Sequence, residues 1–230
     1  MKRYLITGAS RGIGRAIALR LAANDVTLLL HGRDAAALNE TCSALAPTGA
    51  HVVRFLHDLA VVDGVEALIR DVGREPIDLL VNNAGLAVVK PFAEVTRTEW
   101  EQTLGVNVTA PFFLMQHFAP RMRPGASVVN ILSVAARTAF PNWSAYCASK
   151  FALEGLSAAI REELRPRKVR MLNIYPGATD TEIWNSVGGQ WPREKMMSAA
   201  EVADAVAYAL SQRPEIALEN ITLANTGGAL

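Results

Sequence analysis

Short apolar runs rich in leucine and branched residues alternate with longer amphipathic stretches along the chain, which is typical of βαβ units around a parallel sheet. Most runs are continuously apolar, as expected for strands covered by helices on both faces. Strands are predicted at residues 3–6, 26–31, 51–56, 79–82, 127–132, 169–175 and 216–224, and helices at 12–23, 34–46, 61–73, 97–121, 143–165 and 199–211. The predicted fold is therefore α/β: a Rossmann-like, doubly wound parallel sheet of about seven strands with helices on both faces.

The pattern runs through all 230 residues without an internal repeat, a low-complexity tract or a long polar linker. We therefore expect residues 1–230 to form a single dinucleotide-binding catalytic domain. The irregular stretch 177–197 is rich in Gly, Pro and Trp. We interpret it as a loop, with a candidate substrate loop at about 180–197.

Composition argues against several other classes of protein. The chain has 23 basic and 22 acidic residues, a balance that predicts neither a nucleic-acid partner nor an anionic membrane. Its two cysteines, Cys42 and Cys147, fit neither a disulfide framework nor a CxxC motif, and the four histidines lack metal-site spacing. No run approaches a signal-peptide core or the ~20 apolar residues of a membrane span. We expect a cytoplasmic protein without a metal.

A glycine-rich turn lies directly between the first predicted strand and the first predicted helix. Glycines permit a tight turn and let the backbone approach a pyrophosphate, whose charge the helix N-terminus can receive. The alternative is an ordinary left-handed turn or a close helix–strand contact, but the position favours nucleotide binding. The residues of the turn predicted to bind the cofactor are Gly8, Ser10, Arg11, Gly12, Ile13 and Gly14.

The tip of the second predicted strand bears on the choice between NAD and NADP. An acidic residue there would bond the ribose 2′-hydroxyl, whereas an arginine would receive a 2′-phosphate. Asp34 is a formal candidate for the ribose acid, but it stands just before a predicted helix, where we interpret it as a cap. Arg33 and Arg11 then form a basic pair suited to a phosphate, the alternative being two solvated surface arginines. NADP(H) is therefore predicted in preference to NAD(H).

Tyr146 and Lys150 are four residues apart in a predicted helix, so their side chains share one face. Tyrosine has an unperturbed pKa of about 10, and a neighbouring ammonium would favour its phenolate. Ser133 ends the fifth predicted strand, at the edge where parallel sheets bind ligands, and its hydroxyl could donate to a substrate oxygen. The alternatives are a surface pair for the first two residues and a turn cap for the third.

Taken together, these motifs make the whole chain resemble the classical short-chain dehydrogenase/reductase family. The matching motifs occur in the order typical of the family: Thr7-Gly8-x-x-x-Gly12-Ile13-Gly14, Asp58-Leu59, Asn82-Asn83-Ala84-Gly85, Asn107, Ser133, Tyr146-x-x-x-Lys150 and Pro176-Gly177-x-x-x-Thr181. Arg11 and Cys147 are tolerated departures, and the chain ends shortly after Asn225-Thr226-Gly227-Gly228.

The resemblance implies a catalytic group of Asn107, Ser133, Tyr146 and Lys150. Tyr146 would donate a proton to the carbonyl oxygen that Ser133 holds, Lys150 would lower the tyrosine pKa and bind the nicotinamide ribose, and Asn107 would position a relay water. Further cofactor contacts are implied for the adenosine side at Asp58, Leu59, Asn83, Ala84 and Gly85, and for the nicotinamide side at Pro176, Gly177, Thr179 and Thr181. The family also implies a homodimer or homotetramer.

The sequence thus predicts an NADP(H)-dependent oxidoreductase that moves a hydride between nicotinamide and a carbonyl or secondary alcohol, with Tyr146 as acid/base. The apolar residues Ile183, Trp184, Trp191, Met196 and Met197 suggest a loop that closes over a partly hydrophobic substrate, or alternatively a satellite cluster or dimer contact. Two alternative functions are a nucleotide-sensing regulatory or scaffold protein without turnover, and another cofactor-dependent reaction such as epimerisation or dehydration.

Overall fold

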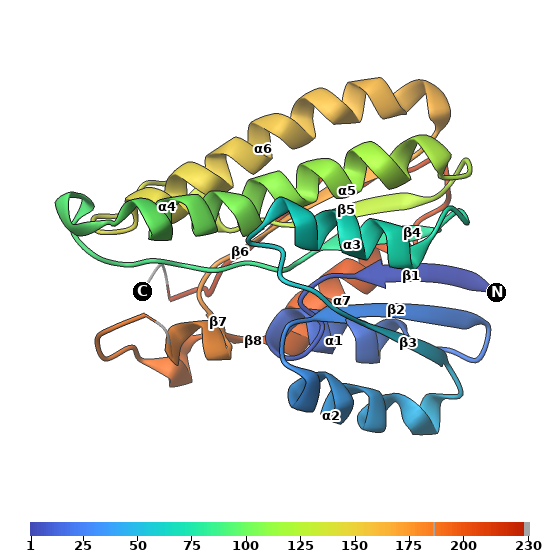
Figure 1. Ribbon diagram of the computed structural model, residues 1–230, viewed down its shortest axis with the longest axis horizontal. Coiled ribbons are helices and arrows are strands. Elements are labelled where there is room, and N and C mark those ends of the chain that lie inside the picture. The colour runs from blue at the N-terminus through green and yellow to red at the C-terminus, as the bar shows by residue number, and fades with distance from the viewer. Residues whose placement is uncertain (186, 228–230) are drawn as a thin grey trace.

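The computed structural model describes residues 1–185 and 187–227 and contains a seven-stranded sheet in the order β3-β2-β1-β4-β5-β6-β9 (Figure 1). Every neighbouring pair in this sheet is parallel. The strands are β1 (Lys2–Ile6), β2 (Val26–Gly32), β3 (His51–Leu56), β4 (Leu79–Asn82), β5 (Ser127–Ile131), β6 (Arg170–Pro176) and β9 (Asn220–Leu223). The strand order reverses between β1 and β4, so the doubly wound Rossmann-like fold is confirmed.

Helices cover both faces of the sheet (Figure 1). One face carries α1 (Gly12–Leu21), α2 (Ala35–Leu45) and α7 (Ala199–Leu210), and the other carries α3 (Val62–Val72), α5 (Ala110–Phe118) and α6 (Ser144–Leu164). Neighbouring side chains of a strand point to opposite faces. Leu5 therefore joins the core under α3, α5 and α6, whereas Ile6 joins the core under α1, α2 and α7.

The helix predicted over 97–121 is wrong as one continuous element. The structure divides it into α4 (Arg97–Leu104), a π-helical turn at Gly105–Thr109, α5, and a 3₁₀ turn at Ala119–Arg121. Pro111 lies four residues after Asn107 and has no N–H, so it cannot close the α-helical hydrogen bond to that carbonyl. The helix accommodates the proline by widening into a π turn, a feature often found at functional sites.

The strand predicted at 216–224 begins too early, because only Asn220–Leu223 pairs with β6. The guanidinium of Arg170 explains the difference. It contacts the main-chain carbonyls of Leu210, Gln212 and Ile216, so the chain before β9 binds the Arg170 side chain. Gly228 of the predicted C-terminal motif lies outside the described residues.

The stretch 177–197 closes on itself at its base. Two short parallel strands, β7 (Thr179–Asp180) and β8 (Met197–Ser198), pair with each other and bring its ends together. Between them lie two 3₁₀ turns, Glu182–Asn185 and Arg193–Lys195. Ser186 of the predicted substrate loop lies outside the described residues.

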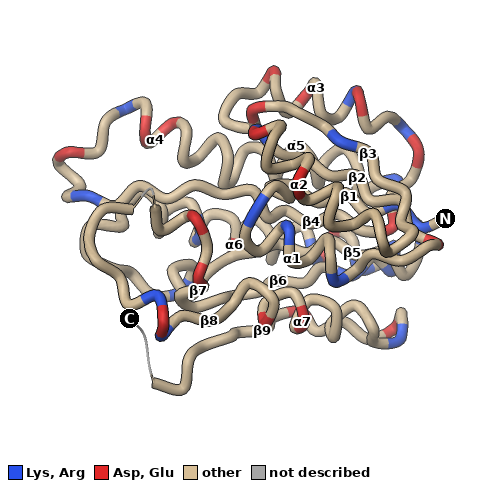
Figure 2. The backbone as a smooth tube through the Cα atoms, turned by 90° about the horizontal axis from the view of Figure 1, so that it is seen from below, with Lys and Arg blue, Asp and Glu red and all other residues tan. Residues whose placement is uncertain are grey.

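Acidic and basic residues are interspersed over the outer elements, as Figure 2 shows. Within residues 1–185 and 187–227, no helix is both long and apolar enough to cross a membrane.

Candidate active site

The residues predicted to bind a dinucleotide follow the carboxyl ends of the strands in the order of the sheet. Asp58 follows β3, Arg33 follows β2, the glycine turn follows β1, and Asn83 follows β4; Ser133 and Gly177 follow β5 and β6. Strands lie about 4.8 Å apart, so five spacings cover roughly 24 Å. This edge therefore offers an elongated site that suits a dinucleotide.

The glycine turn has a backbone that only glycine adopts without strain. Gly8 and Gly12 have φ of +65° and +54°. A Cβ on Gly14 would lie 2.2 Å from the carbonyl oxygen of Gly8 and 2.4 Å from Nδ2 of Asn83, so no side chain fits there. The turn thus brings its main chain against the start of α1, where a pyrophosphate can be received.

The end of β4 holds this turn in place. The Asn83 amide donates to the carbonyls of Thr7 and Gly8 at 2.9 and 3.1 Å. The Thr7 hydroxyl in turn accepts the N–H groups of Asn83 and Ala84, both at 3.0 Å. Asn83 and Ala84 therefore contact the turn itself, and Thr7 fixes the distance between the two strands' ends.

A buried histidine supports the turn from below, and the sequence reasoning missed it. Nδ1 of His31 accepts the Gly8 N–H at 3.4 Å, while its Nε2 donates to the His57 carbonyl at 3.0 Å. Burial lowers the pKa of His31 to about 4, so the ring is neutral at pH 7 and keeps its acceptor. The available signal was a histidine inside an otherwise apolar strand.

Both candidate phosphate-binding arginines lie at the solvent-exposed rim, each opposite a carboxylate. Arg11 lies 3.0 Å from Asp34, and Arg33 lies 3.7 Å from Asp58. Asp34 also accepts the Ala37 N–H at 3.1 Å, which confirms its interpretation as the cap of α2. Asp58 accepts the Ala60 N–H at 3.0 Å, so it is a loop cap as well as a candidate adenosine contact.

The side chains of two other predicted cofactor residues are buried. Leu59 packs into the core under α3 and α5, so it anchors the loop rather than offering a polar contact. Ser10 is packed over Gly32, where an added Cβ would lie 2.1 Å from the serine hydroxyl. Ile13 is partly exposed at the start of α1.

At the other end of the edge, Tyr146 and Lys150 occupy the first turns of α6. The Ser133 hydroxyl accepts the Ala135 N–H at 3.1 Å, so it is a turn cap, and it lies near enough to the Tyr146 phenol to act on its pKa. Lys150 is 5% exposed, and its Nζ donates to the Ile131 carbonyl at 2.9 Å. That ammonium lies 5.6 Å from the centre of the Tyr146 ring.

Burial shifts the two pKa values toward the neutral forms of both groups. Desolvation raises the pKa of Tyr146 to about 12, although the nearby Ser133 hydroxyl acts to lower it. Burial lowers the pKa of Lys150 to about 8. The phenol therefore carries its proton at pH 7, and the lowered tyrosine pKa expected from Lys150 stays a prediction.

The π turn brings Asn107 beside this pair. Its amide accepts the Leu86 N–H and donates to the Leu86 carbonyl and to Ser149 Oγ, all at 2.9 Å. Ser149 then donates to the Tyr146 carbonyl at 2.7 Å. Ser149 was missed by sequence reasoning, although its place between Tyr146 and Lys150 was the available signal. Ser149 ties Asn107 to α6.

The remaining predicted residues close the gap between the two ends. A Cβ on Gly85 would lie 3.5 Å from Asn107 Oδ1 and 3.9 Å from Lys150 Nζ, and a Cβ on Gly12 would lie 3.1 Å from Thr181 Cγ2. Pro176 ends β6, the Gly177 N–H donates to the Leu223 carbonyl at 2.8 Å, and the buried Thr179 donates to the Gly177 carbonyl at 3.1 Å. The glycine turn, β6 and α6 therefore meet around one site.

The described part of the chain contains no group of three or more His, Cys, Asp or Glu residues placed to hold a metal ion. The four histidines do not gather: His31 and His57 lie near the glycine turn, His51 is on β3, and His117 is on α5.

Comparison with known proteins gives consistent matches. Residues 2–190 match the family described as short chain dehydrogenase. Gluconate 5-dehydrogenase of Gluconobacter oxydans is 36% identical over 187 residues, which cover 79% of this chain and 72% of that protein. L-xylulose reductase of Mesocricetus auratus is 33% identical and covers 100% of this chain and 96% of that protein. An alcohol dehydrogenase of Thermococcus sibiricus, solved with 5-hydroxy-NADP, superposes with a TM-score of 0.87 at 27% identity, covering 98% of this chain and 97% of that one.

Proposed function

The chain belongs to the short-chain dehydrogenase family, and from that premise we propose that it is an NADP(H)-dependent oxidoreductase with Tyr146 as acid/base. Its substrate would be a carbonyl compound or a secondary alcohol. The observation that carries the proposal is the placement of Tyr146 within 5.6 Å of the buried Lys150 ammonium, measured to the centre of its ring, beside Ser133 on the edge that also carries the glycine turn.

The residues present fit a dinucleotide, because a tightly packed glycine turn leads directly into the N-terminus of α1, where main-chain N–H groups can receive a pyrophosphate. The proposed contacts of the glycine turn are Gly8, Ser10, Arg11, Gly12, Ile13 and Gly14, with Arg11 directed to the 2′-phosphate. The other proposed adenosine contacts are Arg33, Asp58, Leu59, Asn83 and Ala84, and Gly85 leads from these toward the nicotinamide. The nicotinamide and ribose contacts are Tyr146, Lys150, Pro176, Gly177, Thr179 and Thr181. When bound, the nicotinamide supplies or takes up the hydride.

In the direction of reduction, Tyr146 donates the proton from its phenol oxygen to the carbonyl oxygen, which Ser133 holds by a hydrogen bond. A pKa of about 12 keeps that proton in place at neutral pH. The chain's own electrostatics therefore favour the proton donor. Oxidation of an alcohol needs the phenolate instead, and a cationic nicotinamide beside Lys150 would lower the cost of forming it.

Lys150 would hold the ribose and stabilise the phenolate left after proton donation. One N–H of its ammonium is used by the Ile131 carbonyl, which fixes the direction of the side chain. The Asn107 amide is committed to Leu86 and Ser149. The proposed relay water therefore depends on the main-chain carbonyl of Asn107 in the π turn.

The preference for NADP(H) is supported by Arg11 and Arg33 at the adenosine end. Each arginine contacts a half-exposed carboxylate. On binding NADP(H), each would contact the dianionic 2′-phosphate instead, which offers more acceptor oxygens and allows bidentate hydrogen bonds. The solved neighbour with an NADP analogue supports the same assignment.

The proposal is tested by titrating the protein with NADPH and NADH and then following cofactor oxidation with a panel of ketones and aldehydes. We expect tighter binding of NADPH and turnover of at least one class of carbonyl. Binding of neither nucleotide would overturn the proposal, and binding without turnover of any substrate would favour a nucleotide sensor. A homo-oligomeric state, a cytoplasmic location and a single domain stay predictions of the same account.

A further inference from the structure

Three of the four tryptophans of the chain gather beside Tyr146. The Trp143 ring lies edge-to-face on the Tyr146 ring at 5.5 Å between centroids. Trp184 and Trp191 lie 5.9 and 6.2 Å from Trp143 and 4.8 Å from each other. We call these three residues the tryptophan wall. They form a continuous aromatic surface that begins at the proposed proton donor.

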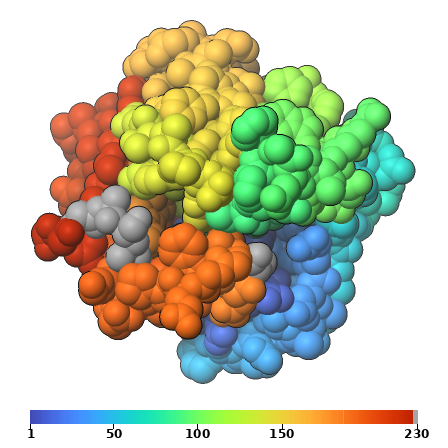
Figure 3. Space-filling model, turned by 90° about the vertical axis from the view of Figure 1, so that its left-hand side faces the viewer, coloured from blue at the N-terminus to red at the C-terminus, as the bar shows by residue number. Residues whose placement is uncertain are grey.

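The wall is built from two separate segments. Trp143 immediately precedes α6 and is fixed by that helix. Trp184 and Trp191 come from the stretch between β7 and β8, which Figure 3 shows in orange against the yellow segment that leads into α6. Arg193 fastens this stretch through Asp180, the Asn185 amide at 3.2 Å and the Thr181 carbonyl at 3.0 Å. Arg193 therefore holds the two ends of this segment together.

The polar groups of this segment's tryptophans are used within the segment. The indole N–H of Trp184 donates to the Thr179 carbonyl at 2.8 Å, and that of Trp191 donates to the Gly188 carbonyl at 3.1 Å. A substrate rich in hydroxyl groups would lose its hydration here without gaining hydrogen bonds from the indole N–H groups, which are already used. Trp184 and Trp191 therefore present only their apolar ring surfaces to a substrate.

The wall is neither a core cluster nor a cage for a cation. All three side chains are partly exposed, and none belongs to the two hydrophobic cores that flank the sheet. A cation cage needs rings arranged around a vacancy. These rings contact one another, and the acidic Asp180 nearby is already paired with Arg193. A flat apolar group laid against the wall is the ligand that this surface fits.

We propose that the tryptophan wall selects aromatic ketones and aldehydes over saturated or polyhydroxylated carbonyl compounds. The inference rests on the proposed function, because the carbonyl must reach Tyr146. Its aryl substituent would pack on Trp143 while Trp184 and Trp191 cover the far ring, which excludes water from the carbonyl.

The test compares three carbonyl substrates with NADPH: 2-acetylnaphthalene, its saturated counterpart 2-acetyldecalin, and dihydroxyacetone. For the wild-type protein we expect the highest kcat/KM with 2-acetylnaphthalene. Trp184→Leu and Trp191→Leu should each lower the naphthyl-to-decalin ratio of kcat/KM by about ten-fold. Trp184→Phe, which keeps an aromatic face, should recover most of that ratio.

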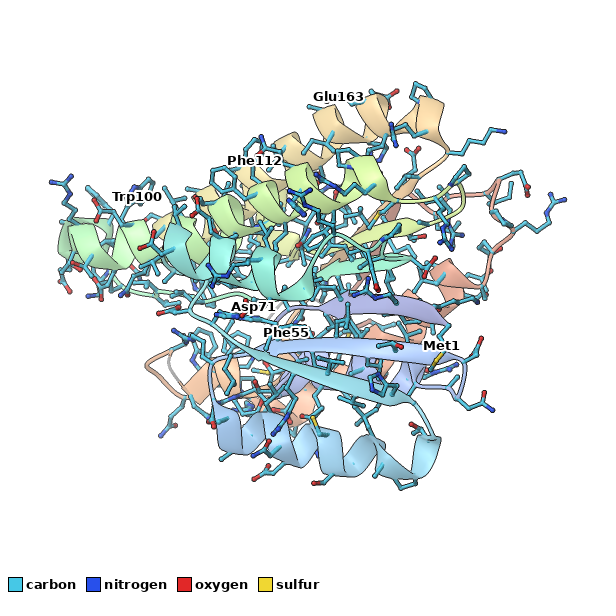
Figure 4. All side chains as sticks on the ribbon, turned by 45° about the vertical axis from the view of Figure 1, so that its right-hand side comes forward. Met1, Phe55, Asp71, Trp100, Phe112 and Glu163 are labelled. Atoms are coloured by element: carbon cyan, nitrogen blue, oxygen red, sulfur yellow. The ribbon has the colours of Figure 1, made fainter. Side chains whose placement is uncertain are left out.

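Trp100 provides the matched control. It is 41% exposed on α4, where Figure 4 labels it, and belongs to another part of the fold. Trp100→Leu should keep the naphthyl-to-decalin ratio within about two-fold of wild type. A second readout is tryptophan fluorescence, which 2-acetylnaphthalene should quench strongly in wild type and Trp100→Leu but weakly in the double variant Trp184→Leu, Trp191→Leu.

The outcomes separate the inference from the function on which it rests. Turnover of dihydroxyacetone or 2-acetyldecalin with no preference for the aromatic ketone would refute the selective role of the tryptophan wall. The proposed oxidoreductase function would stand. An aromatic preference that Trp184→Leu and Trp191→Leu both leave unchanged would overturn the inference equally. No turnover of any carbonyl despite NADPH binding would overturn both.

Discussion

His31 accepts a hydrogen bond from the main-chain N–H of Gly8, so a buried ring on β2 supports the glycine turn that follows β1. This contact needs a neutral imidazole, because a protonated ring has no acceptor. The ring is 2% exposed, and burial lowers its pKa to about 4. The hydrogen bond that supports the glycine turn therefore depends on pH.

Protonation of His31 should therefore lower the free energy of unfolding as the pH falls below 6.5. The unfolded chain takes up this proton near 6.5, whereas the folded chain takes it up near 4, so stability is fully present above 6.5 and is lost as pH falls through 4. Relative to His31→Gln, wild type should lose about 3 kcal/mol between pH 7 and pH 4. Urea unfolding of both proteins at four pH values measures the difference. Parallel stability curves would show that His31 does not titrate in this way.

Carbonyl reduction should depend on the charge of Lys150. Its pKa is lowered to about 8, while the Tyr146 phenol stays protonated to about 12. We expect kcat/KM for reduction to be level from pH 6 to about 8 and then to fall by up to ten-fold per pH unit. In Lys150→Met, the residual activity should be low and without this step. A wild-type profile that stays level to pH 10 would refute the role of the ammonium.

Gly14→Ala should abolish tight NADPH binding. The added Cβ would lie 2.2 Å from the Gly8 carbonyl oxygen, so the turn must open. We expect at least a ~100-fold weaker Kd, because the main chain loses its approach to the pyrophosphate. Gly155→Ala is the control: nothing lies within 4 Å of its added Cβ in α6, and the change should stabilise the protein by about 0.5–1 kcal/mol. Calorimetric titration of both variants decides the point.

Arg33→Asp should shift the cofactor preference toward NADH. The new carboxylate would repel the 2′-phosphate and join Asp58, which already lies 3.7 Å from Arg33. We expect the Kd for NADPH to rise about 100-fold and that for NADH to change little. Arg213→Asp makes the same charge change at an exposed position before β9 and should alter neither Kd. Equal losses for both nucleotides in Arg33→Asp would indicate a disturbed loop instead of a lost phosphate contact.

The sequence predicted the structure best at positions where a residue type serves one well-defined structural role. Continuous apolar runs predicted the covered strands, and Asp34 before an alanine-rich stretch predicted the cap of α2. The π turn escaped prediction because apolar periodicity continues through it, although Pro111 is its physical cause. The tryptophan wall also needed coordinates, because Trp143 and Trp191 are 48 residues apart and meet only when β7 and β8 pair.

The central claim is that the Tyr146 phenol passes its proton to a carbonyl that receives hydride from NADPH. The most direct measurement is a single turnover with NADPH deuterated at C4 and an accepted ketone, comparing wild type with Tyr146→Phe. The account predicts deuterium on the new alcohol carbon in wild type, and in the variant a rate at least ~1,000-fold lower with NADPH binding retained. Equal rates in the two proteins, or an alcohol without deuterium, would contradict it.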